Sequence, residues 1–290
     1  MLSEQDVAKY REEGFIVVEN VLTPEQLQEA RALIKEKIEA AREINSPTDV
    51  YDLEPGHKPD HPRVRRIKTP HLHMPFISDL ARTPRLVEIL QKLLNTHNVR
   101  LHGSKINMKS PSGGSPVEWH QDWAFYPHTN DDLLAVGVML EDCTVENGAM
   151  YMIPGTQHGP VFDHHADGIF VGAMNPTDVE LPKAVSCVGK AGSMSFHHVR
   201  TVHGSAQNLS DKPRTLLLYE FSAADAWPMF NPPTDLAAYE ARMVSGTSTL
   251  QPRLTQVPVR IPLPQPPKHS GIYEMQLAAK NRHFGTKTAA

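Results

Sequence analysis

The chain contains 290 residues, of which 40% are hydrophobic and 21% are charged, with only two cysteines and a formal net charge of −4. This composition is typical of a soluble globular protein, and it gives no reason to expect a nucleic-acid partner, a zinc ribbon or a disulfide framework. The length favours one catalytic domain over residues 1–290, and the low cysteine content favours a reducing, cytoplasmic setting. No run approaches the 18 apolar residues of a membrane span and no signal peptide is visible, so we expect no membrane contact.

Residues 1–98 predict helices around short strands, which would support the rest of the domain. Residues 3–13 combine a helix start with an apolar stripe, Gly14 ends this helix, and the β-branched run FIVVENVL follows as a strand. Thr23 and Gln26 then have the spacing of a capping box, with a proline at the first helical position. This pattern predicts a long charged helix that ends near Ala41.

A long loop interrupts this helical region. Residues 44–61 have turn chemistry and no sustained period, and long loops in compact domains are often functional lids. We expect this loop to cover a substrate, and the candidate contacts are Tyr51, His57 and His61. After the loop, RVRRIKTPHLH predicts a basic strand, and a helical period returns over residues 74–95.

Beyond Val99 the sequence predicts a β-rich core. Short strands separated by Gly, Pro, Asn and Asp continue to about residue 225, a spacing that favours a sandwich or barrel over alternating βαβ units. Residues 226–290 follow as an extension, in which 252–267 holds six prolines and should run extended over the surface, while the tail 284–290 should fray. The architecture we infer is α+β, mostly β, with N-terminal helices packed outside a barrel.

A polar pair lies inside an aromatic run, VEWHQDWAFYP at residues 117–127. If this stretch is a strand, His120 and Asp122 point to one face while Trp119 and Trp123 point to the other. Two polar groups that face a protein interior need either each other or a metal. Because a lone His-x-Asp arises often by chance, the pair needs a third ligand before it indicates a metal site.

His203 can supply that third ligand. It follows a strand, and the turn NLSDKP should return the chain as an antiparallel strand from Arg214, so that a hairpin brings Arg214 close to His203. Two imidazoles and one carboxylate leave three octahedral positions for a bidentate co-substrate and dioxygen, which suits non-haem Fe(II). The guanidinium fork of Arg214 matches the distal carboxylate of 2-oxoglutarate, and Ser205 is placed to donate a hydrogen bond to it.

Together with these residues, longer stretches resemble the phytanoyl-CoA dioxygenase family of Fe(II)/2-oxoglutarate-dependent oxygenases. The similar stretches, which cover most of the chain, are EEGFIVVENVLTPEQL, RRIKTPHLH, KSPSGGSPVEWHQDW, LEDCTVENGAMYMIPGTQH and VHGSAQNLSDKPR. The resemblance implies a double-stranded β-helix core, of the jelly-roll or cupin-like kind, over residues 99–225. It also implies an enzyme that uses Fe(II), 2-oxoglutarate and O2 to hydroxylate a small organic metabolite, with release of succinate and CO2.

The resemblance assigns roles to individual residues. The iron ligands of the family, its 2-oxoglutarate-binding arginine and the serine near the distal histidine fall on His120, Asp122, His203, Arg214 and Ser205. Two further co-substrate contacts fall on Arg66, which lies in a run with Arg65 and Lys68, and on Lys105. Halogenating relatives carry a small residue where this chain has Asp122, so the aspartate favours hydroxylation over halogenation.

Two other hypotheses stay open. A member that binds metal and 2-oxoglutarate without turnover would act as a sensor, and the same His-Asp-His set can hold zinc in a hydrolase. The basic residues near Lys105 would suit an anionic substrate, although most of them are more simply solvated. Four histidines are rejected as ligands because none has a carboxylate at ligand spacing with an arginine behind it: His128, His158, His197 and His198. The aromatic residues near the metal pair should pack, with one or two lining a substrate cavity: Trp119, Trp123, Phe125 and Tyr126.

Overall fold

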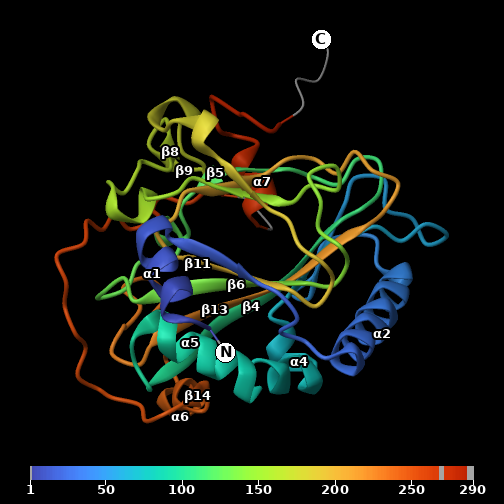
Figure 1. Ribbon diagram of the computed structural model, residues 1–290. Helices are drawn as coiled ribbons and strands as arrows, with labels where there is room; N and C mark the ends of the chain where they lie inside the picture. The colour runs from blue at the N-terminus through green and yellow to red at the C-terminus, as the bar shows by residue number, and fades with distance from the viewer. Residues whose placement is uncertain (1, 268–270, 286–290) are drawn as a thin grey trace.

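The computed structural model describes residues 2–267 and 271–285 and contains two facing antiparallel sheets (Figure 1). The main sheet runs β1-β11-β6-β13-β4-β3-β2, with β14 beside β4, and the smaller sheet runs β10-β7-β12-β5. The main-sheet strands are β1 Phe15–Val18, β2 Tyr51–Leu53, β3 Val64–Lys68, β4 Val99–Lys109, β6 Leu133–Met139, β11 Met194–His198, β13 Arg214–Ala223 and β14 Met243–Ser245. The smaller sheet holds β5 Val117–His120, β7 Met150–Met152, β10 Val185–Cys187 and β12 His203–Ser205, and a separate ribbon holds β8 His165–Ala166 and β9 Ile169–Phe170.

Most of the helices lie around the main sheet, whereas α7 lies near β5 of the smaller sheet. They are α1 Glu4–Glu13, α2 Pro24–Ala40, α3 Pro70–His73, α4 Pro75–Leu80, α5 Pro84–Leu94, α6 Leu236–Glu240 and α7 Ile272–Gln276. The helical period predicted over residues 74–95 is thus divided between α4 and α5, because Pro84 starts a new helix. Among the described residues, no helix has the length and apolarity needed to cross a membrane.

Successive side chains of β13 point to opposite faces of the main sheet, one facing the hydrophobic core and the other facing the pocket. Leu217, Tyr219 and Phe221 belong to the large core that also contains buried residues of α1, α2, α4 and α5. The intervening residues Leu216 and Leu218 face the interior between the two sheets, where they line a pocket. Since successive strand residues point to opposite faces, one strand can complete the hydrophobic core and line the pocket at the same time.

The first and last parts of the chain contribute strands to the same main sheet. β1, β2 and β3 come from residues 1–98, and β14 comes from the extension after residue 225. The strands of residues 99–225 therefore do not form this sheet alone. The loop predicted over residues 44–61 contains β2, which pairs with β3 at the sheet edge.

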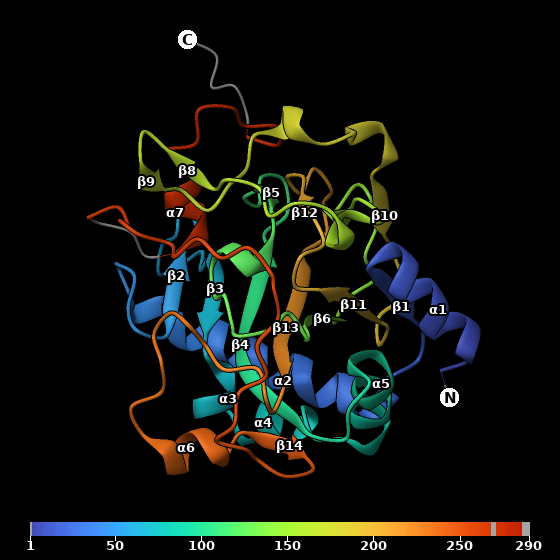
Figure 2. The same ribbon diagram turned by 90° about the vertical axis from the view of Figure 1, so that its left-hand side faces the viewer.

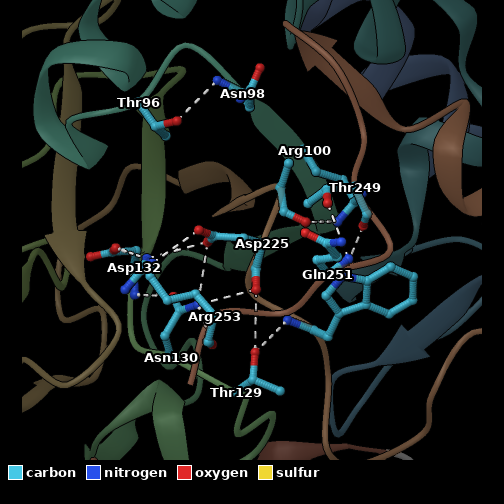
Figure 3. Close-up of polar contacts among 12 residues, drawn as sticks. Thr96, Asn98, Arg100, Thr129, Asn130, Asp132, Asp225, Thr249, Gln251 and Arg253 are labelled. Carbon is cyan, nitrogen blue, oxygen red and sulfur yellow. Dashed lines mark hydrogen bonds and ion pairs between the residues drawn. The ribbon is translucent and has the colours of Figure 1, made fainter. Parts of the chain in front are cut away.

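The C-terminal extension is bonded to the barrel at several points. At one end, the guanidinium of Arg253 donates to the carboxylate of Asp225 at 3.0 Å (Figure 3). Further along, the indole of Trp123 donates to the carbonyl of Pro258 at 2.9 Å. The proline-rich segment 252–267 contains neither helix nor strand, in agreement with the prediction from its composition.

The extension then returns to the smaller sheet. Figure 2 shows α7, in red, at the top of the molecule near β5 and the β8–β9 ribbon. The prediction that the tail frays from residue 284 is wrong for Phe284 and Gly285, because their backbone N–H groups donate to the Glu118 carboxylate at 2.9 Å and 2.5 Å. The rest of the predicted tail, residues 286–290, lies outside the described residues.

The predicted capping box at the start of α2 is present. The Thr23 hydroxyl accepts from the Gln26 N–H at 3.2 Å, and the Gln26 side-chain oxygen accepts from the Thr23 N–H at 3.0 Å. Two backbone donors that the helix itself cannot satisfy are thereby satisfied. The cap stabilises a helix that buries Ala30 and Ile34 against the main sheet.

We expect Thr23→Ala to lower the free energy of unfolding by about 1 kcal/mol, because alanine leaves the Gln26 N–H without its acceptor. Urea denaturation monitored by circular dichroism measures this difference. Thr23→Ser keeps the hydroxyl and should stay close to wild type. An equal loss in both variants would contradict a capping role.

Candidate active site

Three potential metal ligands meet at the edge of the smaller sheet. His120 ends β5, His203 begins β12, and the two residues are directly paired in the antiparallel register. Nε2 of His120 lies 3.7 Å and Nε2 of His203 lies 3.9 Å from Oδ1 of Asp122. One ligand atom from each residue lies within 4.8 Å of the others, and all three residues are buried. The sheet register thus brings together residues more than eighty positions apart in the sequence.

The prediction that one strand carries both His120 and Asp122 is wrong. β5 ends at His120, and Asp122 begins a 3-10 turn, Asp122–Ala124, in which the Phe125 N–H donates to the Asp122 carbonyl at 2.9 Å. The turn redirects the chain while the carboxylate still faces the two imidazoles. The strand pattern therefore identified the correct two residues, although the turn and not the strand positions the Asp122 carboxylate.

Backbone carbonyls orient both imidazoles. Nδ1 of His120 lies 2.8 Å from the Glu118 carbonyl, and Nδ1 of His203 lies 3.0 Å from the Thr201 carbonyl. A carbonyl can only accept, so each Nδ1 carries the proton and each Nε2 lone pair is available to a metal. Burial lowers the pKa of His120 to about 4 and that of His203 well below its ordinary value. Neutral imidazoles are the form that binds metal ions.

Asp122 is held as a carboxylate. Burial alone would raise its pKa, but His203, a contact from His197 and the ammonium of Lys105 outweigh burial and hold that pKa well below its ordinary value. Nε2 of His197 lies 3.3 Å from Oδ2, the oxygen that does not face the other two ligands. Sequence analysis rejected His197 as a ligand and did not predict this contact. It arises because β11 and the 3-10 turn meet in the tertiary structure, and no local sequence signal reveals it.

The triad opens into a pocket between the two sheets, which we call the inner pocket. Its lining includes all three potential ligands together with Arg214, Ser205 and Asn107. Apolar groups of Met150, Leu216 and Leu218 form much of the remaining wall. The lining thus combines the three potential ligands with a guanidinium and with apolar side chains.

The predicted hairpin between His203 and Arg214 is wrong. β12 pairs with β5 and β7 in the smaller sheet, whereas β13 pairs with β4 and β6 in the main sheet. The turn after residue 205 therefore carries the chain from one sheet to the other. Arg214 consequently reaches the inner pocket from the opposite wall rather than from a neighbouring strand.

Arg214 has the properties of an anion-binding residue. It is 3% exposed, and one terminal nitrogen donates to the Gly148 carbonyl at 2.9 Å. Within residues 2–267 and 271–285, its Nε has no hydrogen-bond partner and no carboxylate lies within ion-pair distance. Burying a guanidinium without an anion costs free energy, so the part of the pocket beside Arg214 fits a carboxylate ligand.

The two other predicted co-substrate residues lie near the triad. The ammonium of Lys105 lines the inner pocket and donates to Glu220 at 2.9 Å. Arg66 forms an ion pair with the buried Asp52 and does not line the inner pocket. Both basic residues line a second hollow, the adjoining pocket, together with Asp122.

Two of the aromatic residues near the metal pair line the adjoining pocket, as the sequence predicted. Phe125 and Tyr126 form part of its wall, while Trp119 and Trp123 are buried in hydrophobic clusters. The lid residues proposed in the 44–61 loop lie elsewhere. Tyr51 belongs to the helix-facing core, His57 contacts the Ile44 carbonyl at 2.9 Å, and His61 forms a backbone bridge with Lys58. The C-terminal helix α7 instead supplies Ile272 and Tyr273 to the inner pocket.

Comparisons with known proteins agree on one family. The model of the phytanoyl-CoA dioxygenase family matches residues 10–216. A probable alpha-ketoglutarate-dependent hypophosphite dioxygenase of Stutzerimonas stutzeri is 37% identical over 295 residues, covering 98% of this chain and 100% of the relative. An ectoine dioxygenase of Bordetella bronchiseptica is 29% identical, covering 80% of this chain and 78% of the relative.

Solved structures agree on the fold. The iron-bound structure of EctD from S. alaskensis has a TM-score of 0.66 at 20% identity and covers 87% of this chain and 88% of its own. The complex of EvdO2 from Micromonospora carbonacea with 2-oxoglutarate has a TM-score of 0.62 at 24% identity and covers 81% and 96%. The predicted double-stranded β-helix is confirmed, and so is the predicted enzyme class. The chain belongs to the phytanoyl-CoA dioxygenase family and is an Fe(II)/2-oxoglutarate-dependent dioxygenase that acts on a small molecule.

Proposed function

We propose that His120, Asp122 and His203 bind Fe(II) and that Arg214, with Ser205, binds the distal carboxylate of 2-oxoglutarate. The donor set supports the first assignment, because two neutral imidazoles and one carboxylate leave open positions for a chelating co-substrate and O2. The buried guanidinium of Arg214, which lines the same pocket, supports the second. Neither the sensor nor the zinc hydrolase considered from the sequence receives comparable support.

We propose further that the primary substrate is a small phosphorus oxyanion of the hypophosphite class. The observation that carries this proposal is the 37% identity to the hypophosphite dioxygenase over nearly the whole of both chains. The adjoining pocket supports it, because Lys105 and Arg66 line that pocket beside Asp122. Glu220 and Asp122 keep the pKa of Lys105 above its ordinary value despite burial, so the ammonium stays charged and attracts an anion.

Different residues of the chain have different roles in the proposed reaction. Iron, when bound, supplies the activation of O2 that is coupled to oxidation of 2-oxoglutarate. Arg214 and Ser205 orient the co-substrate, while Leu216 and Leu218 exclude water from it. Lys105 holds the substrate anion near the metal. One oxygen atom enters a P–H bond to give phosphite, and the other is retained in succinate when CO2 leaves.

A second candidate is hydroxylation of a small zwitterionic organic molecule. The ectoine dioxygenase of Bordetella bronchiseptica and an L-proline trans-4-hydroxylase of Streptomyces griseoviridis are 29% and 26% identical to this chain. Such substrates carry a carboxylate that Lys105 would also attract. The lower identity and the shorter coverage of these relatives make this the weaker candidate.

Replacing a metal ligand should abolish metal binding. We expect His120→Ala and Asp122→Ala each to weaken Mn(II) binding by more than about 100-fold, since each removes one of three protein ligands. Anaerobic calorimetry with Mn(II) and 2-oxoglutarate measures the change. His158→Ala, at one of the rejected histidines, is the matched control and should bind as wild type. Unchanged binding in Asp122→Ala would contradict the assignment of this ligand.

Arg214→Met should raise the KM for 2-oxoglutarate by more than about tenfold, because hydrogen bonds to a charged group contribute roughly 1.5–3 kcal/mol. Succinate release at varied 2-oxoglutarate measures this effect. Arg214→Lys keeps the positive charge but loses the planar donor pair of the guanidinium. Its KM for 2-oxoglutarate should lie between the values of wild type and Arg214→Met. Arg260→Met is the control, because that side chain is half exposed and pairs with Asp163. A KM equal to that of wild type would place the co-substrate elsewhere.

The substrate assignment predicts that hypophosphite stimulates succinate release and is converted to phosphite, which 31P nuclear magnetic resonance detects. Ectoine, L-proline and phosphite serve as comparison compounds under the same conditions. Lys105→Gln should raise the KM for hypophosphite more than that for 2-oxoglutarate. Stimulation by ectoine or L-proline without stimulation by hypophosphite would replace the first candidate by the second.

A further inference from the structure

The short helix α7 contributes side chains to the lining of both pockets of the active site. Ile272 lines the inner pocket and the adjoining pocket, where Lys105 and Arg66 lie. The next residue, Tyr273, lines the inner pocket and also bounds a hollow on the flank of the molecule, together with Arg65. Its ring therefore lies between the inner pocket and this hollow.

This helix belongs to the segment of residues 271–285, which we call the C-terminal arm. The arm is hydrogen-bonded to β5, the strand that carries His120. The side-chain oxygen of Gln276 accepts from the Glu118 N–H at 2.8 Å, and its amide donates to the Gly172 carbonyl at 2.7 Å. The Glu118 carboxylate in turn accepts from the His283 N–H at 2.6 Å. The carbonyl of Glu118 is the group that orients the His120 imidazole. One residue thus connects the arm to a proposed metal ligand.

Tyr273 itself is held by Arg65. The Arg65 guanidinium lies 4.4 Å from the centroid of the Tyr273 ring and forms an ion pair with Glu274 of the same helix. Both contacts fix the ring at the pocket wall, with Tyr273 6% exposed. Arg65 is the neighbour of Arg66 in the basic run of β3, and its guanidinium is directed towards the arm.

The Tyr273 hydroxyl is available to a ligand. Within residues 2–267 and 271–285 it makes no hydrogen bond. Burial raises its pKa, so the hydroxyl stays protonated and can donate, and Arg214 is the charge that acts most strongly on it. Arg214 lines the same pocket, with its Nε also lacking a hydrogen-bond partner in the described residues. Two donors that lack acceptors and line the same pocket fit a carboxylate between them.

We propose that Tyr273 donates its hydroxyl to the carboxylate of 2-oxoglutarate that Arg214 binds, so that co-substrate binding holds the C-terminal arm closed over the active site. The inference rests on the proposed co-substrate role of Arg214. Because Ile272 extends from the same helix over the substrate side, closure for the co-substrate also encloses the substrate. Water is then excluded from both compartments when the co-substrate is consumed.

Kinetics of matched variants test the hydroxyl. Tyr273→Phe keeps the ring and its contact with Arg65 but removes the donor, and it should raise the KM for 2-oxoglutarate by about tenfold. At saturating 2-oxoglutarate its kcat should stay near that of wild type. Leu277→Ala is the control in the same arm, because this side chain is 67% exposed. Mn(II) binding and the melting temperature of Tyr273→Phe should not change, which separates lost donation from lost folding.

Limited proteolysis tests the closure. The arm carries trypsin sites at Lys280 and Arg282, both exposed. With Mn(II) in place of iron, 2-oxoglutarate should slow cleavage at these sites in the wild type, and Tyr273→Phe should need about tenfold more co-substrate for the same protection. Cleavage at a rate independent of 2-oxoglutarate in the wild type would overturn the closure.

The two proposals fail in different ways. If Arg214→Met raises the KM for 2-oxoglutarate and Tyr273→Phe leaves it unchanged, the role of Tyr273 is overturned while the proposed function stands. If neither variant changes that KM, the co-substrate site itself is misplaced and the inference falls with it. An increase in both variants, with Leu277→Ala equal to wild type, supports both proposals.

Discussion

The pairing of β5 with β12 is the constraint on which the active site depends. It places His120 opposite His203, and the 3-10 turn after β5 then brings Asp122 against both. Nε2 of His120 and Nε2 of His203 lie 3.7 Å and 3.9 Å from Oδ1 of Asp122, which is too far for a hydrogen bond. The register that builds the site thus leaves three potential ligand atoms facing one another, an arrangement that suits a cation.

The main sheet adds the second half of the site through strand alternation. Arg214, Leu216 and Leu218 point into the barrel, while Leu217 and Tyr219 anchor the sheet to the helices behind it. The helices behind the main sheet therefore stabilise the wall that carries Arg214, the proposed co-substrate residue, and it is α7, elsewhere in the fold, that lines the pocket. An arginine fixed in this way loses little conformational freedom when its anion binds, which favours affinity.

Charge determines the character of the adjoining pocket. Glu220 and Asp122 raise the pKa of Lys105, whose side chain is 30% exposed, so its ammonium stays charged. Its ammonium and the guanidinium of Arg66 give the adjoining pocket a cationic wall beside the metal site. The C-terminal arm contributes Ile272 to this pocket and both Ile272 and Tyr273 to the inner pocket. Under the proposed function, substrate recognition and co-substrate enclosure are therefore parts of a single arrangement.

The sequence by itself determined the reaction class and part of the local structure. The His-x-Asp pair, His203 and Arg214 at their spacings pointed to an iron oxygenase, and Thr23 with Gln26 predicted the α2 cap, because such signals are local or set by chemical type. Only the tertiary structure decided that β12 and β13 lie in different sheets and that the proposed lid loop forms a sheet edge. It also decided that His197 contacts Asp122 and that Tyr273 reaches Arg214's pocket. These arrangements depend on pairing between distant strands and on how the chain end packs, which no pattern within a short stretch can specify.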